Sequence, residues 1–352
     1  MRAVVYSKTG GPDVLQLVER PVREPGAGEV RVRVQVSGVN PTDWKARRGP
    51  RESAELPFPE VVPNQDGAGT IDAVGAGVAA DRVGERVWLW EAAWERAEGT
   101  AQEFVVLPGS QAARLPDGLS FDVGASLGIP ALTAHRCLTV SDLGPRRLEP
   151  GALTGQTVLV AGGAGAVGHA AIQLARWADA RVISTVSSDQ KAGLARAAGA
   201  DHVINYRNGD AREEILALAP EGVDTVVEVA AAANAGLDEA VLGANGIVAA
   251  YAGIEQRFAS KCGVPARRNA RHVESLVAHL PHQFARSFNR FGDHRIVIGV
   301  AHRLERHRSE QIGGLDTAER TVGVLMIQHP LLRGRDRVPP QLADRMTSVD
   351  AE

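Results

Sequence analysis

The hydrophobic and polar positions divide most of the chain into two stretches with different periods. In residues 1–120, short β-branched runs are separated by Gly, Pro and Asp clusters, which is typical of a barrel-like, largely antiparallel domain. From Gly155 onward, short apolar runs alternate with segments of helical spacing, which predicts a parallel sheet with right-handed crossovers. The predicted strands are 2–6, 30–36, 69–74 and 86–89, then 157–161, 181–186, 202–205, 225–229 and 247–251; the predicted helices are 121–125, 131–138, 167–178, 189–198 and 211–219.

The stretch TVLVAGGAGAVG, residues 157–168, joins a buried strand, a glycine turn and a helix without interruption. Its glycines follow G-x-G-x-x-G order, and a strand-turn-helix context makes that motif far stronger than the spacing alone. Glycine permits a tight turn and lets a dinucleotide pyrophosphate approach main-chain N–H groups at a helix N-terminus. We expect the cofactor to contact Gly163, Ala164, Gly165, Ala166, Val167 and Gly168.

The end of the second α/β strand indicates which dinucleotide is preferred. NAD-binding folds usually carry Asp or Glu there, whereas this chain has Val186 followed by Ser187, Ser188 and Lys191. Hydroxyls and an ammonium suit a 2′-phosphate, so we predict NADPH. Asp189 is interpreted as a helix N-cap or first-turn acid. Further predicted cofactor contacts are Tyr206, after the third α/β strand, and Val229 and Tyr251, at the ends of the next two.

Composition limits the class of protein. The chain has 352 residues, 44% hydrophobic and 23% charged, and a formal net charge of -3, so charge gives no reason to expect nucleic-acid or membrane binding. No run approaches the length of a membrane span and no signal sequence begins the chain, which predicts a cytoplasmic protein. With only Cys137 and Cys262, neither a disulfide framework nor a cysteine-rich zinc site is expected.

The order and spacing of motifs over residues 1–253 resemble the zinc-free quinone oxidoreductase, or ζ-crystallin-like, branch of the medium-chain dehydrogenase/reductase superfamily. The segments that carry the resemblance include SGVNPTDWKARRG, PNQDGAGTIDAVGAGV, GTAQEFVVLP, GIPALTAHRCL, VLVAGGAGAVGHAAIQLA and GADHVINYR. The resemblance implies a GroES-like catalytic domain over 1–120 and a Rossmann NADPH-binding domain over 121–253. It also implies hydride transfer from NADPH to quinones or α,β-unsaturated carbonyls, in a family that is commonly dimeric.

The resemblance also locates where zinc-dependent relatives bind their metal. Those relatives have a Cys and a His-Glu pair at positions that match Asn40, Gln65 and Asp66 here. Thiolate and imidazole ligands are thus replaced by amides, so we expect no metal and a carbonyl polarised by hydrogen bonds instead.

Candidate catalytic residues follow from the same resemblance. Asn40 and Asp43 match the family's N-P-x-D segment, and Thr133 matches the Thr of its G-I-P-x-x-T-A segment. The alternative roles of these residues are in turns and caps. Lys45 stands where many relatives have a Tyr; it could donate a proton if burial lowers its pKa, and a solvated lysine is the alternative.

The family pattern is lost after Gly253. Residues 254–352 contain fifteen arginines but a single lysine, and the stretches 295–300 and 321–327 are their predicted strands. One hypothesis is a frameshift that replaced the family C-terminus; the alternative is a genuine basic segment that binds nucleic acid or a partner. Disorder is one interpretation of this atypical tail. Without a sixth sheet strand, we expect lower stability and loss of the usual dimer edge.

Three functions follow as hypotheses. The first is an NADPH-dependent, metal-free reductase of quinones or enones. The second is an enoyl reductase that acts on acyl thioesters, because the same fold reduces a carbon–carbon double bond conjugated to a carbonyl. The third is an NADPH-binding protein that is inactive because its C-terminus is disrupted.

Overall fold

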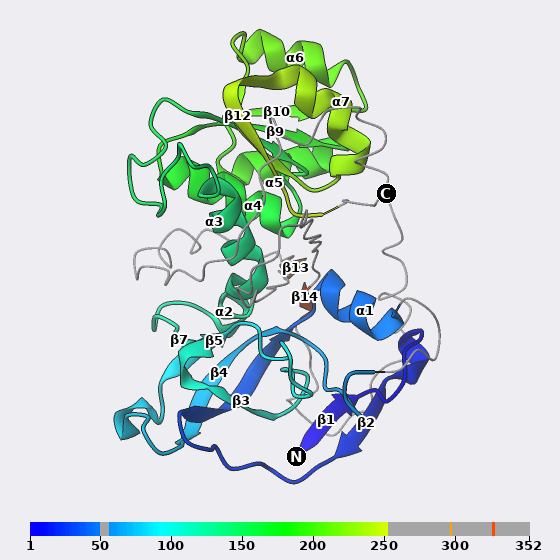
Figure 1. Ribbon diagram of the computed structural model, residues 1–352, viewed down its shortest axis with the longest axis vertical. Helices are drawn as coiled ribbons and strands as arrows, with labels where there is room; N and C mark the ends of the chain where they lie inside the picture. Colours follow the sequence, from blue (N-terminus) through cyan, green and yellow to red (C-terminus); the bar gives the residue numbers. More distant parts are fainter. Residues whose placement is uncertain (50–55, 253–295, 298–325, 328–352) are drawn as a thin grey trace, which may run out of the picture. The chain divides into compact units, whose positions relative to one another are not determined.

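The computed structural model describes residues 1–49, 56–252, 296–297 and 326–327 (Figure 1). The chain divides into two compact units between Ile129 and Pro130, further along than the boundary predicted near residue 120. The first unit contains Met1–Ile129 and the short antiparallel pair β13 (Ile296–Val297) and β14 (Met326–Ile327). These two strands fall within the stretches predicted after Gly253; Gly253 itself and the rest of the tail lie outside the described residues.

The first unit is built on a five-stranded antiparallel sheet with strand order β6-β3-β4-β5-β7. A separate antiparallel hairpin precedes it, and the result confirms the predicted mostly β, GroES-like architecture. The strands are β1 (Arg2–Val5), β2 (Gln16–Glu19), β3 (Glu29–Gly38), β4 (Asp66–Val74), β5 (Arg86–Leu89), β6 (Phe104–Pro108) and β7 (Ala112–Arg114).

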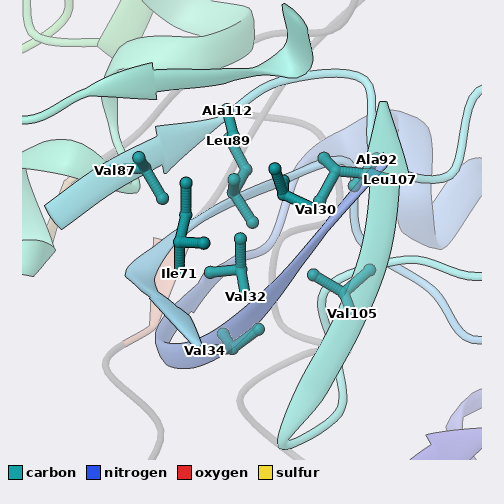
Figure 2. Packing of buried hydrophobic residues seen from close by; sticks show 10 residues of the cluster. All are labelled: Val30, Val32, Val34, Ile71, Val87, Leu89, Ala92, Val105, Leu107 and Ala112. Atoms are coloured by element: carbon teal, nitrogen blue, oxygen red, sulfur yellow. The ribbon is translucent and has the colours of Figure 1, made fainter. Parts of the chain in front are cut away.

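Strict alternation along β3 explains why this strand lies at the centre of the core. Val30, Val32 and Val34 are buried, while the residues between them are polar and point to the other face. Figure 2 shows these valines in one cluster with Ile71 of β4 and with residues of β5 and β6. Full burial of each such side chain contributes about 1.5–3 kcal/mol, so this cluster fixes the register of the sheet.

The first unit also contains helices. The largest is α1 (Pro41–Arg48), at a place where the sequence predicted only turn residues. Proline suits the first position of a helix, and three basic residues in the last turn complement the helix dipole, so the N-P-x-D segment begins a helix. The shorter helical segments are Pro12–Val14, Ala80–Arg82, Gly109–Gln111, α2 (Phe121–Gly124) and the start of the π-helical turn Leu127–Ala131.

The second unit is a parallel five-stranded sheet with strand order β10-β9-β8-β11-β12. The order reverses between β8 and β11, as in a doubly wound Rossmann fold, and the predicted parallel sheet is confirmed. The strands are β8 (Thr157–Ala161), β9 (Arg181–Val186), β10 (His202–Asn205), β11 (Val223–Glu228) and β12 (Leu242–Ala250); the helices are α3 (Leu132–Leu138), α4 (Ala166–Trp177), α5 (Asp189–Ala198), α6 (Ala211–Leu218) and α7 (Ala231–Val241).

Helix α7 is the main element of this unit that the sequence did not predict. Its sequence, AAANAGLDEAV, has few large apolar residues and therefore a weak helical period, although alanine favours helix strongly. The helix packs on β11 and β12, and α4 packs on β8 and β9. Within the described residues, β12 is the last strand on its side of the sheet.

Candidate functional site

The glycine turn after β8 combines a positive φ with very close packing. Gly162 has φ +65, so the left-handed residue of the turn precedes the G-x-G-x-x-G motif. The amide of Gly165 donates to the carbonyl of Gly162 at 2.8 Å, and α4 begins directly afterwards with Gly165 as its N-cap. Main-chain N–H groups in the first turn of a helix have no intrahelical acceptor, so this turn can receive an anionic group.

Two motif glycines leave no space for a side chain. A Cβ at Gly163 would lie 2.0 Å from Oγ of Ser184, and one at Gly168 would lie 2.4 Å from the carbonyl oxygen of Gly162. Because these glycines have no side chain, the turn packs directly against β9 and the start of α4, which is the packing role expected of motif glycines. Val229 approaches the same turn, because a Cβ at Gly162 would lie 3.3 Å from its Cγ1.

A lysine and a serine pair at the end of β9. The Lys191 Nζ donates to Oγ of Ser187 at 2.8 Å, while Ser188 caps α5 by accepting from the Lys191 amide. Val186 is buried, so its side chain is directed into the core. The pair therefore presents a hydroxyl and an ammonium at the position where NAD-binding folds place an acid.

Tyr206, the residue after β10, is joined to the end of β9 through its backbone. The Tyr206 amide donates to the Val186 carbonyl at 3.1 Å, and the side chain is 48% exposed. Asp189 lies in the first turn of α5, as interpreted from the sequence, and accepts from the Asn205 side chain at 3.2 Å. The Asp189 carboxylate is therefore directed toward Asn205, the last residue of β10.

Tyr251 differs from the other predicted cofactor residues because its side chain is buried. Its amide donates to the carbonyl of Glu228 at the end of β11, and burial raises the pKa of its hydroxyl well above the ordinary value. The structure therefore directs this side chain into the unit.

In the first unit, Asn40 lies at the junction between β3 and α1 and is fully buried. Its backbone N–H donates to Oδ2 of Asp43 at 2.5 Å, which closes the first turn of the helix. Its side-chain Nδ2 donates to Oδ2 of Asp66 at 3.2 Å. Asn40 and Asp43 therefore have the structural roles of a helix start, and Asn40 in addition directs its amide toward a second buried carboxyl.

Burial controls the electrostatics of this region. It raises the pKa of Asp43 from 3.8 to about 7, against hydrogen bonds from Asn40 and Gln65 that lower it. Burial also raises the pKa of Asp66 well above its ordinary value, and the negative charges of Asp43 and Glu91 add to that effect. Three acidic groups thus share a poorly hydrated environment, which favours their neutral forms.

The residues at the positions of zinc ligands are used in other contacts. Gln65 accepts from the Ala93 amide through its side-chain oxygen at 3.1 Å, and Asn40 binds Asp66. In the part of the chain that the structure describes, no three His, Cys, Asp or Glu residues could together hold a metal ion.

The two remaining catalytic candidates have contrasting environments. Lys45 is an exposed residue whose Nζ lies 5.6 Å from the centre of the Trp44 ring, and partial desolvation lowers the pKa of its ammonium. Thr133 is buried on α3 of the second unit, and its Oγ1 has no hydrogen-bond partner within the described residues. An unpaired buried hydroxyl is a group that a bound ligand could satisfy.

Sequence reasoning missed the importance of Asp66. We considered it only as a replaced zinc position, whereas the structure shows that it contacts Asn40 and the backbone of Ile129. An acidic residue at the start of the apolar, Gly-containing strand β4 (Asp66–Val74) was the available signal, because a carboxyl at the start of a buried strand requires partners.

Comparison with known proteins assigns the two parts of the chain to known dehydrogenase domains. Residues 26–117 match the model of the alcohol dehydrogenase GroES-like domain, and residues 166–290 match that of the zinc-binding dehydrogenase family. The second match extends past Gly253. The chain is 34% identical over 251 residues to rat quinone oxidoreductase, covering 70% of this chain and 72% of the relative.

Two further proteins are similar. Over 230 residues, the chain is 34% identical to the rat synaptic vesicle membrane protein VAT-1 homolog, and the match covers 65% of this chain but only 53% of that protein. The chain thus spans about half of that relative's length. A mycobacterial protein solved in complex with NADPH is 35% identical, with a TM-score of 0.60 and coverage of 71% of this chain and 74% of that one. No helix among the described residues is long and apolar enough to cross a bilayer.

Proposed function

Because this chain belongs to the zinc-free quinone oxidoreductase branch of the medium-chain dehydrogenase/reductase superfamily, we propose that it is an NADPH-dependent reductase of quinones or α,β-unsaturated carbonyls. The observation that carries the proposal is the glycine turn after β8 together with the Lys191–Ser187 pair at the end of β9. The same proposal places the enzyme in the cytoplasm, where it acts on a small-molecule acceptor.

The residues present fit a dinucleotide that carries a 2′-phosphate. The turn at Gly162–Gly168 is too closely packed for side chains but presents the start of α4 to a pyrophosphate. Lys191 and Ser187 would bind the 2′-phosphate, and Tyr206, whose backbone is paired with the end of β9, is a further candidate contact. Val229 would contact the cofactor from the end of β11. When bound, NADPH supplies the hydride.

This chain's own residues would bind and polarise the acceptor. The Thr133 Oγ1 has no partner within the described residues and can donate to a carbonyl group. The Asn40 Nδ2 gives one hydrogen to Asp66 and has a second that can donate to a carbonyl group. Asp43 holds the first turn of α1 and so fixes the backbone of Asn40. Lys45, exposed with a lowered pKa, is the candidate proton donor that completes the two-electron reduction.

The test is a titration of NADPH fluorescence followed by assays of NADPH oxidation with a quinone, an enone and a crotonyl thioester. We expect binding of NADPH in preference to NADH, and oxidation with the quinone or the enone. Oxidation with the thioester alone would support the enoyl reductase hypothesis. Binding without oxidation of any acceptor would support the inactive NADPH-binding protein, and absence of binding would contradict all three.

A further inference from the structure

Asp66 is the first residue of β4 and has no exposed surface. In the antiparallel pair of β3 and β4, it lies opposite Gly38, two residues before Asn40. The register of the sheet therefore places the Asp66 carboxyl beside the point where β3 ends and α1 begins. No spacing in the sequence links these two positions, since 26 residues separate them.

The carboxyl connects two segments to β4. Its Oδ2 accepts from Nδ2 of Asn40 at 3.2 Å and from the backbone N–H of Ile129 at 2.8 Å. The neighbouring Gly128 lies directly against it, because a Cβ at Gly128 would be 2.3 Å from Oδ1. Asp66 thus holds the side chain of Asn40 and also Ile129, the last residue of the segment Met1–Ile129.

Two buried acceptor atoms of Asn40 and Asp66 have no donor in the part of the chain that the structure describes. Oδ1 of Asn40 and Oδ1 of Asp66 are both buried and have no partner within the described residues. An ionised carboxylate can only accept, whereas a neutral carboxylic acid has one O–H hydrogen to donate. The negative charges of Asp43, in α1, and Glu91, in the loop after β5, disfavour a further negative charge on Asp66.

We propose that Asp66 is a positioning residue, whose carboxyl fixes the side-chain amide of Asn40 in the orientation that the acceptor meets. Asp66 itself makes no contact with the acceptor. This inference rests on the proposed function only in its last step, since the fixed orientation of Asn40 exists without turnover.

The variants D66N and D66A test the proposal. An amide, like a neutral acid, has both a donor and an acceptor, so D66N should keep kcat within a few-fold of the parent. D66A should lower kcat by up to about 10²-fold, because a misplaced active-site group costs that much. The Kd for NADPH should stay the same in both. D72N, on the same strand but paired with Arg31, is the matched control and should leave kcat unchanged.

Three outcomes would overturn the proposal. The first is a D66A variant with the parent's kcat. The second is equal loss of kcat in D66N and D66A. The third is a D66A variant that also loses NADPH binding, which would show a general structural defect.

A second measurement separates this proposal from the proposed function. Selective ¹⁵N-asparagine labelling reports the Asn40 side-chain amide directly, with an N40D variant to assign its signal. We expect a similar, slowly exchanging signal in the parent and D66N, and a shifted, faster-exchanging signal in D66A. An unchanged signal in D66A would contradict positioning even if no acceptor is reduced. G128A, which pushes a methyl group against the Asp66 carboxyl, should shift the signal in the same direction as D66A.

Discussion

The two units contain candidate sites of different construction. In the second unit, the site is a continuous stretch of backbone in which Gly163 and Gly168 have no room for a side chain. In the first unit, the site consists of side chains from separate elements, such as Asn40 and Asp66, which meet in a buried and acidic environment. The site in the second unit depends on backbone geometry, whereas the site in the first unit depends on desolvated carboxyl groups. Glycine substitutions should therefore affect the second unit, and changes of pH or of acidic residues should affect the first.

The largest expected effect is an opposite pH dependence of Asp43 in the first unit and of two buried histidines in the second. Asp43 in the first unit has a pKa raised from 3.8 to about 7, so the native state retains a proton that the unfolded state loses. Its contribution to stability is present below pH 4 and declines as the pH rises toward 7, by at most about 4 kcal/mol. Denaturant unfolding from pH 4 to 8 measures this decline, and D43N, which keeps a hydrogen-bond acceptor, should reduce it.

Histidines of the second unit should act in the other direction. Burial lowers the pKa of both His135 and His169 from 6.5 to about 4. The unfolded state therefore binds protons first as the pH falls below 6.5, and stability decreases from there toward pH 4. An H135Q variant should lose part of this acid sensitivity while retaining the decline above pH 4 that Asp43 causes. Identical pH profiles for the parent and both variants would contradict the comparison.

The next effect concerns backbone geometry in the second unit. G168A places a methyl group 2.4 Å from the carbonyl oxygen of Gly162. Because that contact is with backbone, relief requires movement of the turn, and we expect a loss of about 1–3 kcal/mol in stability. NADPH affinity, measured by fluorescence, should fall with it. Tight NADPH binding by G168A would show that the turn is not the pyrophosphate site.

A smaller effect should distinguish the two dinucleotides. K191A removes the ammonium that contacts Oγ of Ser187 at the end of β9. We expect about a tenfold loss of NADPH affinity, equal to about 1.4 kcal/mol, because a charged partner of the 2′-phosphate is lost. NADH affinity should stay unchanged. Equal losses for both dinucleotides would place Lys191 outside the 2′-phosphate site.

The smallest effect is a gain in stability. Gly193 lies within α5, and a Cβ there would meet no atom within 4 Å. G193A should therefore stabilise the protein by about 0.5–1 kcal/mol, since glycine is unfavourable in a helix interior. The variant serves as the matched control for G168A, and unfolding midpoints measured side by side test the contrast. A loss of stability in both would show that glycine replacement is harmful irrespective of local space.

The first three strands of the second unit were predicted most accurately, whereas β11 and β12 each begin earlier than predicted. The observed bounds of β8, β9 and β10 agree with the prediction, because buried parallel strands form continuous apolar runs. The helix α1 was missed, since its polar sequence lacks an apolar period and its start depends on Asn40 and Asp43 contacting each other. Lys191 and Ser187 are hydrogen-bonded to each other, while their cofactor role stays a prediction.

By itself, the sequence determined the parallel sheet, the glycine turn and the family of this protein. Each of these follows from the periodicity or spacing of residues within a contiguous segment. Only the tertiary structure decided that Asp66 holds Asn40 and the Ile129 backbone. The physical reason is that register in an antiparallel sheet and desolvation of a carboxyl depend on neighbours far away in the chain. Such neighbours leave no pattern within the segment itself.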